Sequence, residues 1–166
     1  VRTSLKTFKP EIIEDLQEEN KLVTKYDKLI ASAKIEFDGK VNNLAQMTPY
    51  MSSPDRSIRR DAETAVFKFF AEHVHEFDNI YDSLVKLRDM IAKKLGFANY
   101  IPLGYARLDR SDYDDKMVAN YRKQVYEDLI PIVKEIIEDK RKRLNIDELK
   151  SYDLNLNFIS GNPKPK

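Results

Sequence analysis

Residues 58–96 read IRRDAETAVFKFFAEHVHEFDNIYDSLVKLRDMIAKKLG, and this stretch decides the fold class. Its apolar side chains recur every three or four positions, which is the spacing of one face of an α-helix. Gly96 follows the last of them, and glycine is common just after a helix ends. The pattern predicts helical structure over 54–95, as one long helix or as two nearly collinear ones.

Two further segments share this periodicity. Residues 10–33 start at a proline and carry acidic residues early, which predicts a helix with its acids at the positive end of the dipole. Residues 114–143 predict a third helical segment, and Pro131 is expected to kink or interrupt it because proline lacks a backbone donor. With only four glycines in 166 residues, the chain is predicted to be mainly α.

One short β-hairpin is predicted between the first two helical segments. The helical period gives way to alternation around Asp38-Gly39, a pair typical of a tight hairpin turn. A two-residue loop would pair Phe37 with Lys40, whereas a three-residue loop would pair Glu36 with Lys40. The second register places opposite charges across from each other, so we predict that register.

The charges and the missing cysteine argue against several classes of function. The chain carries 29 basic and 28 acidic residues, interleaved, whereas a nucleic-acid-binding domain usually has one basic face. No apolar run approaches the roughly 18 residues that a membrane span needs. The absence of cysteine excludes disulfides and thiolate chemistry. We therefore expect a cytoplasmic protein with neither nucleic acid nor membrane as a partner.

The two histidines do not predict a metal site. His73 and His75 are two positions apart, and residues at that spacing on a helix do not face each other. Glu72 and His75 have the Glu-x-x-His spacing of di-iron bundles, but such sites need a second pair, and residue 70 is a phenylalanine. We expect no catalytic and no metal-binding residue in this chain.

Residues 95–113, LGFANYIPLGYARLDRSDY, predict a corner between helices, because two glycines and a proline interrupt the periodicity. A corner does not require arginines and aspartates threaded among tyrosines, and loops on a rigid scaffold often carry function. Two interpretations stay open, namely corner packing with fixed ion pairs, and a substrate-channel or domain-contact surface. The candidate residues for the second are Tyr105, Arg107, Arg110 and Tyr113.

Several short motifs, taken in order, carry a resemblance to a known family. They are Ile35-Glu36-Phe37-Asp38-Gly39-Lys40, Pro54-Asp55-Arg56, Arg59-Arg60, Leu87-Arg88-Asp89-Met90-Ile91-Ala92, Leu95-Gly96-Phe97, Tyr100, Tyr105, Arg107, Arg110, Asp112-Tyr113, Ile130-Pro131 and Tyr152-Asp153. Over about residues 7–166 the chain resembles the oligoendopeptidase F group of thimet-oligopeptidase-type zinc metallopeptidases.

The resemblance implies a cytoplasmic endopeptidase that hydrolyses short peptides in a channel between helical halves. Such enzymes hold zinc with two histidines of a His-Glu-x-x-His helix and a later glutamate, and the glutamate of the motif activates water. The family places these residues after the segment ending at Lys166, so this segment is expected to be inactive scaffold and channel wall. Zinc is expected in the parent enzyme and not on this chain.

The domain organisation follows from the same resemblance. Residues 1–153 are expected to form a single helical domain of the larger peptidase fold, with 154–166 as an extended tail leading to the missing catalytic segment. The alternative is a self-contained helical protein-interaction module without catalytic activity.

The peptidase interpretation also predicts an exposed surface for the missing catalytic half. A large apolar patch would favour self-association. The expected contributors are Ile35, Phe37, Phe97, Tyr100, Tyr105 and Tyr113, with Arg107 and Arg110 short of acceptors.

Overall fold

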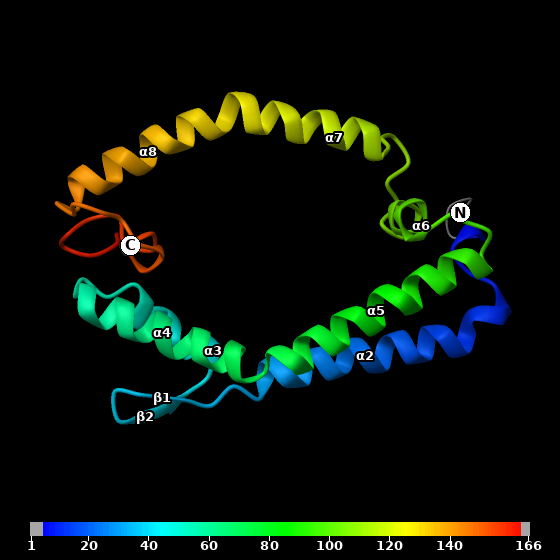
Figure 1. Ribbon diagram of the computed structural model, residues 1–166, viewed down its shortest axis with the longest axis horizontal. Coiled ribbons are helices and arrows are strands. Elements are labelled where there is room, and N and C mark those ends of the chain that lie inside the picture. Colours follow the sequence, from blue (N-terminus) through cyan, green and yellow to red (C-terminus); the bar gives the residue numbers. More distant parts are fainter. Residues whose placement is uncertain (1–4, 164–166) are drawn as a thin grey trace. The chain divides into compact units, whose positions relative to one another are not determined.

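The computed structural model describes residues 5–163, which fold as helices with one short hairpin (Figure 1). The predicted mainly α fold class is confirmed. The chain divides into two compact units. Unit 1 is drawn from Val1–Lys28 and His75–Tyr126, and unit 2 from Leu29–Val74 and Glu127–Lys166. The single domain expected over 1–153 stays a prediction.

Unit 1 is built around two antiparallel helices, α2 (Ile13–Ala31) and α5 (Val74–Lys94), which lie side by side in Figure 1. A 3₁₀ turn at Pro10–Ile12 leads into α2. Proline fits there because the first N–H groups of a helix have no partner within it. The helix predicted over 10–33 is therefore confirmed, apart from its last two residues.

Ion pairs and apolar packing hold α2 against α5. The Nζ atom of Lys94 lies 2.6 Å from the Asp15 carboxylate, and Nε of Arg88 lies 2.6 Å from that of Glu19. The buried core of the unit consists of Ile12, Leu87, Ile91, Ala92, Leu95 and Leu103. Its large apolar side chains each contribute about 1.5–3 kcal/mol when removed from water, so this core is the main source of the unit's stability.

The C-terminus of α5 has the geometry that its glycine predicts. Gly96 adopts a φ of +88°, in the left-handed region that side chains disfavour. The N–H group of Phe97 donates to the carbonyl of Ala92 at 2.9 Å, which satisfies one of the last carbonyls of the helix. The chain therefore turns sharply after α5.

The corner that follows contains a helix that the sequence did not predict, α6 (Tyr100–Arg107). The side chain of Asn99 caps its start by accepting a hydrogen bond from the N–H of Ile101 at 2.9 Å. Leu103 is fully buried in the core of unit 1. Packing of this one face fixes the short helix, and α6 carries two of the four predicted site residues, Tyr105 and Arg107.

The helical structure predicted over 54–95 consists of two helices. Asp55 caps α4 (Arg56–Glu72), and α5 starts two residues after α4 ends. His73 separates them, with its N–H donating to the carbonyl of Phe70 at 3.2 Å. Of the two alternatives left open by the periodicity, the pair of helices is the correct one.

Unit 2 combines the hairpin, β1 (Ile35–Phe37) and β2 (Lys40–Asn42), with α3 (Leu44–Met51) and α4. The 3₁₀ turn η3 (Ser151–Asp153) contacts α4 from the other end of the chain. The hairpin contacts both α3 and α4, so neighbouring helices support a pair of strands that would be marginal alone.

The hairpin turns at Asp38-Gly39 as predicted, but the predicted register is wrong. Phe37 pairs directly with Lys40 in a two-residue loop. Asp38 and Gly39 have φ values of +53° and +69°, as the turn type that matches strand twist requires. Tyr50 reinforces this register, because its hydroxyl donates to Asp38 and its ring packs edge-on against Phe37 at 5.0 Å. These contacts outweigh the cross-strand charge pairing that favoured the other register.

The segment predicted over 114–143 is helical with an interruption before its proline. It comprises α7 (Asp115–Gln124), the π-helical turn η2 (Val125–Leu129) and α8 (Ile130–Arg143). Pro131 occupies the first turn of α8. A π turn next to proline accommodates the missing donor without ending the helical run, so the helix changes type before Pro131 and does not break there.

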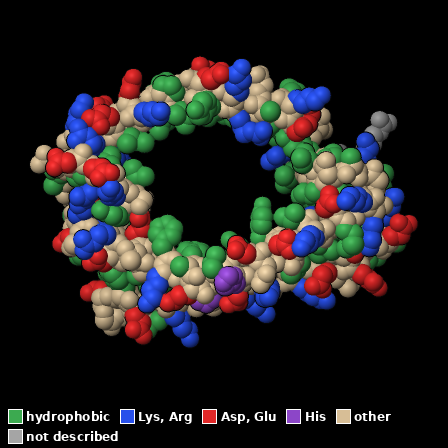
Figure 2. All heavy atoms as spheres, viewed as in Figure 1, with side chains coloured by type: hydrophobic (Ala, Val, Ile, Leu, Met, Phe, Trp, Pro, Cys, Tyr) green, Lys and Arg blue, Asp and Glu red, His purple; other side chains and the backbone are tan. Residues whose placement is uncertain are grey.

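This helical run exposes several large apolar side chains. Within the described chain, no residue of α7, η2 or α8 is buried. Their exposed large apolar side chains are Met117, Tyr121, Tyr126, Leu129, Ile132, Ile136 and Ile137. Figure 2 shows hydrophobic side chains along both helices. No helix among residues 5–163 is long and apolar enough to span a membrane.

The patch predicted for the hairpin and the corner is mostly wrong. Ile35 is buried, and Phe37, Phe97, Tyr100 and Tyr105 are half-buried. Of the six predicted contributors, only Tyr113 is exposed. At the corner the reason is α6, which makes it a packed element, whereas in the hairpin Phe37 packs against Tyr50 and β1 contacts α4.

Candidate functional site

Three of the four predicted site residues lie together in a surface groove of unit 1. The groove has a volume of about 540 Å³ and is bordered by α6, the following loop and the start of α7. Tyr105, Arg110 and Tyr113 all line it. Sequence positions spread over nine residues are thus brought to one surface.

Arg110 is held by two tyrosine rings and by no acid. Its guanidinium carbon lies 5.4 Å from the centre of the Tyr105 ring and 6.0 Å from that of Tyr113. The two rings meet edge to face at 6.0 Å. Among residues 5–163, no carboxylate forms an ion pair with Arg110. Cation–π contact attracts the charge to the rings without using its N–H donors.

The end of α6 fixes the backbone of Arg110. Asp109 adopts a φ of +52°, which reverses the chain just after the helix. The N–H of Arg110 then donates to the carbonyl of Tyr105 at 2.9 Å, and that of Asp109 donates to the carbonyl of Ala106 at 3.1 Å. This pair of hydrogen bonds is typical of the end of a helix, and it holds Arg110 beside Tyr105.

Arg107, the fourth predicted residue, belongs to a different cluster. Its Nη1 donates to both carboxylate oxygens of Glu19, at 3.1 and 3.0 Å, and Arg88 donates to the same carboxylate. The Tyr100 ring lies 5.9 Å from the guanidinium carbon of Arg107. Arg107 therefore ties α6 to α2.

One donor of Arg107 is left over. Its Nη2 atom is buried and has no hydrogen-bond partner among the described residues. This fits the expectation that the arginines of the corner are short of acceptors. A single carboxylate, Glu19, is shared by two guanidinium groups, so the cluster carries an excess positive charge.

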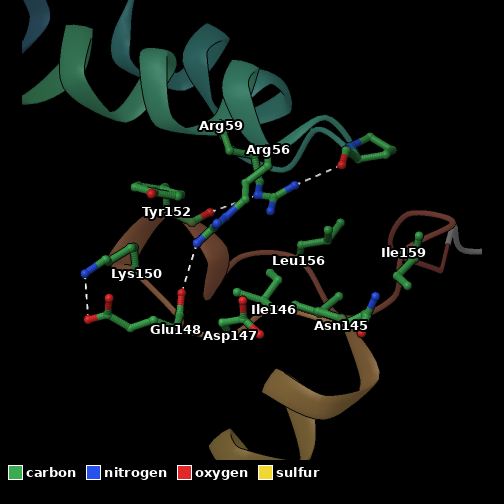
Figure 3. A pocket seen from close by; sticks show the side chains of 12 residues that line it. Arg56, Arg59, Asn145, Ile146, Asp147, Glu148, Lys150, Tyr152, Leu156 and Ile159 are labelled. Atoms are coloured by element: carbon green, nitrogen blue, oxygen red, sulfur yellow. Dashed lines mark hydrogen bonds and ion pairs between the residues drawn. The ribbon is translucent and has the colours of Figure 1, made fainter.

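A second pocket, in unit 2, surrounds a buried ion cluster. Figure 3 shows Arg56 and Arg59 extending from α4 toward the loop that carries Tyr152. Asp153, which is fully buried, accepts from Nη2 of Arg59 at 2.7 Å and from Nη2 of Arg56 at 2.8 Å. Arg59 also donates to the carbonyls of Ser53, Pro54 and Tyr152. Every nitrogen of the Arg59 guanidinium group therefore donates a hydrogen bond, and these bonds hold η3 to the start of α4.

The charge of Asp153 is stabilised despite its burial. Burial alone would raise the pKa of this carboxyl group. Hydrogen bonds from Arg56, from the N–H of Lys150 and from Arg59 outweigh it and lower the pKa to about 2. Asp153 is therefore ionised at neutral pH, and this cluster has no titratable group poised for acid–base catalysis.

The described residues do not assemble a metal site. No group of three or more histidine, cysteine, aspartate or glutamate side chains among them could hold a metal ion. The Nδ1 atom of His73 is 2.9 Å from the carbonyl of Phe69, whereas His75 is exposed. The residues present in this part of the chain therefore do not fit a catalytic zinc ion.

Comparison with known proteins identifies the family. The profile of peptidase family M3 matches residues 49–158, which include α4, α5, α6 and the lining of the candidate groove except Lys6. The chain belongs to peptidase family M3. A search of curated proteins returned no match.

Solved structures agree with the M3 assignment. The chain is 50% identical to a structure named for oligoendopeptidase F, with a TM-score of 0.97, and 52% identical to PZ peptidase A with an inhibitor, with a TM-score of 0.96. An oligoendopeptidase F structure from Bacillus anthracis is 47% identical, with a TM-score of 0.94. Each comparison covers 99% of this chain. The chain spans about 29–30% of the length of these solved structures.

Sequence reasoning missed how the M3 chain uses its other arginines. Arg56, Arg59 and Asp153 stand in motifs that carried the resemblance, but nothing in those motifs indicated that they meet. Their contacts join positions 94 and 97 residues apart. A buried aspartate and an exposed one look the same in a sequence, so only the fold separates them.

Proposed function

We propose that this chain is part of a cytoplasmic, zinc-dependent endopeptidase that hydrolyses short peptides. In this proposal the segment supplies scaffold and one wall of the substrate channel, and other parts of the peptidase supply the metal ligands. The observation that carries it is the match to family M3 over residues 49–158. The agreement with oligoendopeptidase F over 99% of the chain supports it.

The side chains present support the assignment of the channel wall to this chain and of the metal ligands to other parts of the peptidase. The described residues offer no cluster of metal ligands. The carboxyl group of Asp153, whose pKa is lowered to about 2, is buried and paired with two arginines. The groove beside α6, in contrast, presents the guanidinium group of Arg110, which pairs with no carboxylate among residues 5–163. Such a surface binds substrate, but it does not activate water.

The proposal is tested by measuring metal content and hydrolysis separately. The purified chain is dialysed against zinc, and bound metal is measured by atomic emission together with turnover of an internally quenched peptide. We expect no stoichiometric zinc and no turnover from this chain. Adding the zinc-binding remainder of the peptidase in trans should restore hydrolysis.

Two outcomes would count against the proposal. Tight zinc binding with turnover by the chain itself would refute the assignment of the metal ligands to other parts of the enzyme. A chain that leaves the activity of the zinc-binding part unchanged would favour the alternative, an interaction module without a catalytic role.

A further inference from the structure

The groove beside α6 combines features that recognise one particular chemical group. It is bordered by the Arg110 guanidinium, which lies over the rings of Tyr105 and Tyr113. We propose that Arg110 binds a carboxylate of the peptide substrate, and that the two tyrosines hold the guanidinium in place for it. This inference rests on the proposed function, since it takes the carboxylate to belong to a peptide.

The first argument is the contrast in ion pairing. Arg107, three residues earlier, is paired with Glu19, and Arg60 on α4 is paired with Asp61. Arg110 has ring contacts but no carboxylate partner among residues 5–163. A planar guanidinium presents several N–H donors in a fork that matches a carboxylate, and those of Arg110 are not taken by an acid.

The second argument is preorganisation. The left-handed Asp109 and the backbone bond from Arg110 to Tyr105 fix where this side chain leaves the helix end. The rings of Tyr105 and Tyr113 meet edge to face, and their contacts with Arg110 limit the positions available to the guanidinium. A ligand that binds here meets a group whose freedom is already restricted, which reduces the entropy lost on binding.

The third argument is the charge of the groove as a whole. Its lining includes two cations, Lys6 and Arg110, and two acids, Asp114 and Asp115. Asp114 is already engaged, since its side chain accepts from the N–H of Met117 at 2.8 Å. A groove with balanced charge does not attract a polyanion, but it accommodates a single carboxylate close to its guanidinium.

A carboxylate of a peptide has two sources, the C-terminus and an aspartate or glutamate side chain. Three peptides that differ only in their carboxylate groups distinguish them. One has a free C-terminus and no acidic residue, one has an amidated C-terminus and no acidic residue, and one is amidated but carries a glutamate. The chain is ¹⁵N-labelled, and the Nε–H signal of Arg110 is followed by NMR during titration without zinc.

We expect the Arg110 signal to shift with saturation for at least one carboxylate peptide, and not for the peptide lacking any. Response to the first peptide assigns the C-terminus, and response to the third assigns the side chain. Arg110→Gln should weaken that binding about tenfold, since it removes a charged hydrogen-bond donor. Arg110→Lys, which keeps the charge but loses the fork, should weaken it less, and Arg60→Gln should leave it unchanged.

The inference would be overturned if the peptide without any carboxylate bound as tightly as the two that carry one. It would also be overturned if Arg110→Gln weakened the binding of all three peptides equally. The titration needs no hydrolysis. A peptidase that cleaved no peptide would therefore refute the proposed function, while a failed titration would refute only the role of Arg110.

Discussion

Two arginine clusters in this chain use the same chemical group in opposite ways. In unit 2, Arg59 is 1% exposed and donates to Asp153 and to three backbone carbonyls. In unit 1, Arg110 is exposed, touches two tyrosine rings and pairs with no acid among the described residues. The comparison separates an arginine whose donors are all used within the fold from one that pairs with no acid among the described residues.

The largest expected effect comes from removing the acid of the buried cluster. Asp153→Ala leaves Arg59 buried without its carboxylate, and breaking a buried pair costs about 3–5 kcal/mol. We expect the free energy of unfolding of unit 2 to fall by that amount in urea titrations. Hydrogen exchange of the Lys150 amide, which donates to Asp153, should accelerate as a local measure.

The matched control is Asp61→Asn, which removes the charge of an exposed aspartate paired with Arg60. An exposed pair contributes at most about 1 kcal/mol. If the Asp153 and Asp61 variants lost the same stability, the buried pair of Arg59 would contribute no more than the exposed pair of Arg60, and the comparison would not hold.

The second prediction is a pH dependence that belongs to Asp153. Its folded pKa of about 2 lies below the ordinary value of 3.8, so its charge stabilises the fold above pH 4. This contribution, about 2 kcal/mol, is lost as the pH falls from about 4 toward 2, because the unfolded chain takes up the proton first. Urea titrations at several pH values measure it, and Asp153→Asn should remove that part of the slope. An unchanged slope in the variant would contradict the assigned pKa.

The third prediction concerns an intermediate case in unit 1, the carboxylate of Glu19. Both Arg88 and Arg107 pair with it. Glu19→Gln keeps the shape but removes the charge, and we expect a loss of about 1–2 kcal/mol in unit 1. Glu18→Gln, in an exposed pair with Lys21, is the control and should change stability little. A larger loss from the control would mean that partial burial does not strengthen the shared contact.

The smallest effect on stability is expected at Arg110. Arg110→Gln removes contacts with two rings at an exposed site, which contribute less than about 1 kcal/mol. Arg59→Gln, made for comparison, should cost several times more because its buried partners lose their donor. Thermal unfolding followed by circular dichroism distinguishes them. A large loss at Arg110 would assign it to the fold and remove the reason to expect a ligand there.

The sequence predicted much of the secondary structure because the signals are local. Periodicity located the helices, and Gly96 marked the end of α5. The register of the hairpin was predicted wrongly, because charge pairing was weighed above the left-handed pair Asp38-Gly39 and the contact of Phe37 with Tyr50. Helix α6 was missed although Asn99 and Pro102 are good helix-start residues, because Gly96 before it and Gly104 within it indicated only a corner.

The candidate site was predictable only as a set of residue types. The sequence indicated Tyr105, Arg107, Arg110 and Tyr113 as candidates because a corner between helices does not require charged and aromatic residues. It did not indicate that Arg107 turns to Glu19, 88 residues away along the chain, while Arg110 stays beside the tyrosines. The chain reverses at Asp109, between the two arginines, and the Arg110 N–H bonds back to Tyr105.

The sequence by itself thus determined the helical class, the position of the hairpin turn and the family resemblance. Each depends on neighbouring residues, whose spacing dictates which backbone conformations are allowed and which faces are apolar. Tertiary structure alone decided which arginines are paired, because a guanidinium and its acid meet through contacts between distant segments. Asp153 and Arg59 are joined across 94 residues, and burial makes their pairing obligatory. Arg110 contacts two tyrosine rings and pairs with no acid within the described chain, and its carboxylate ligand is our proposal.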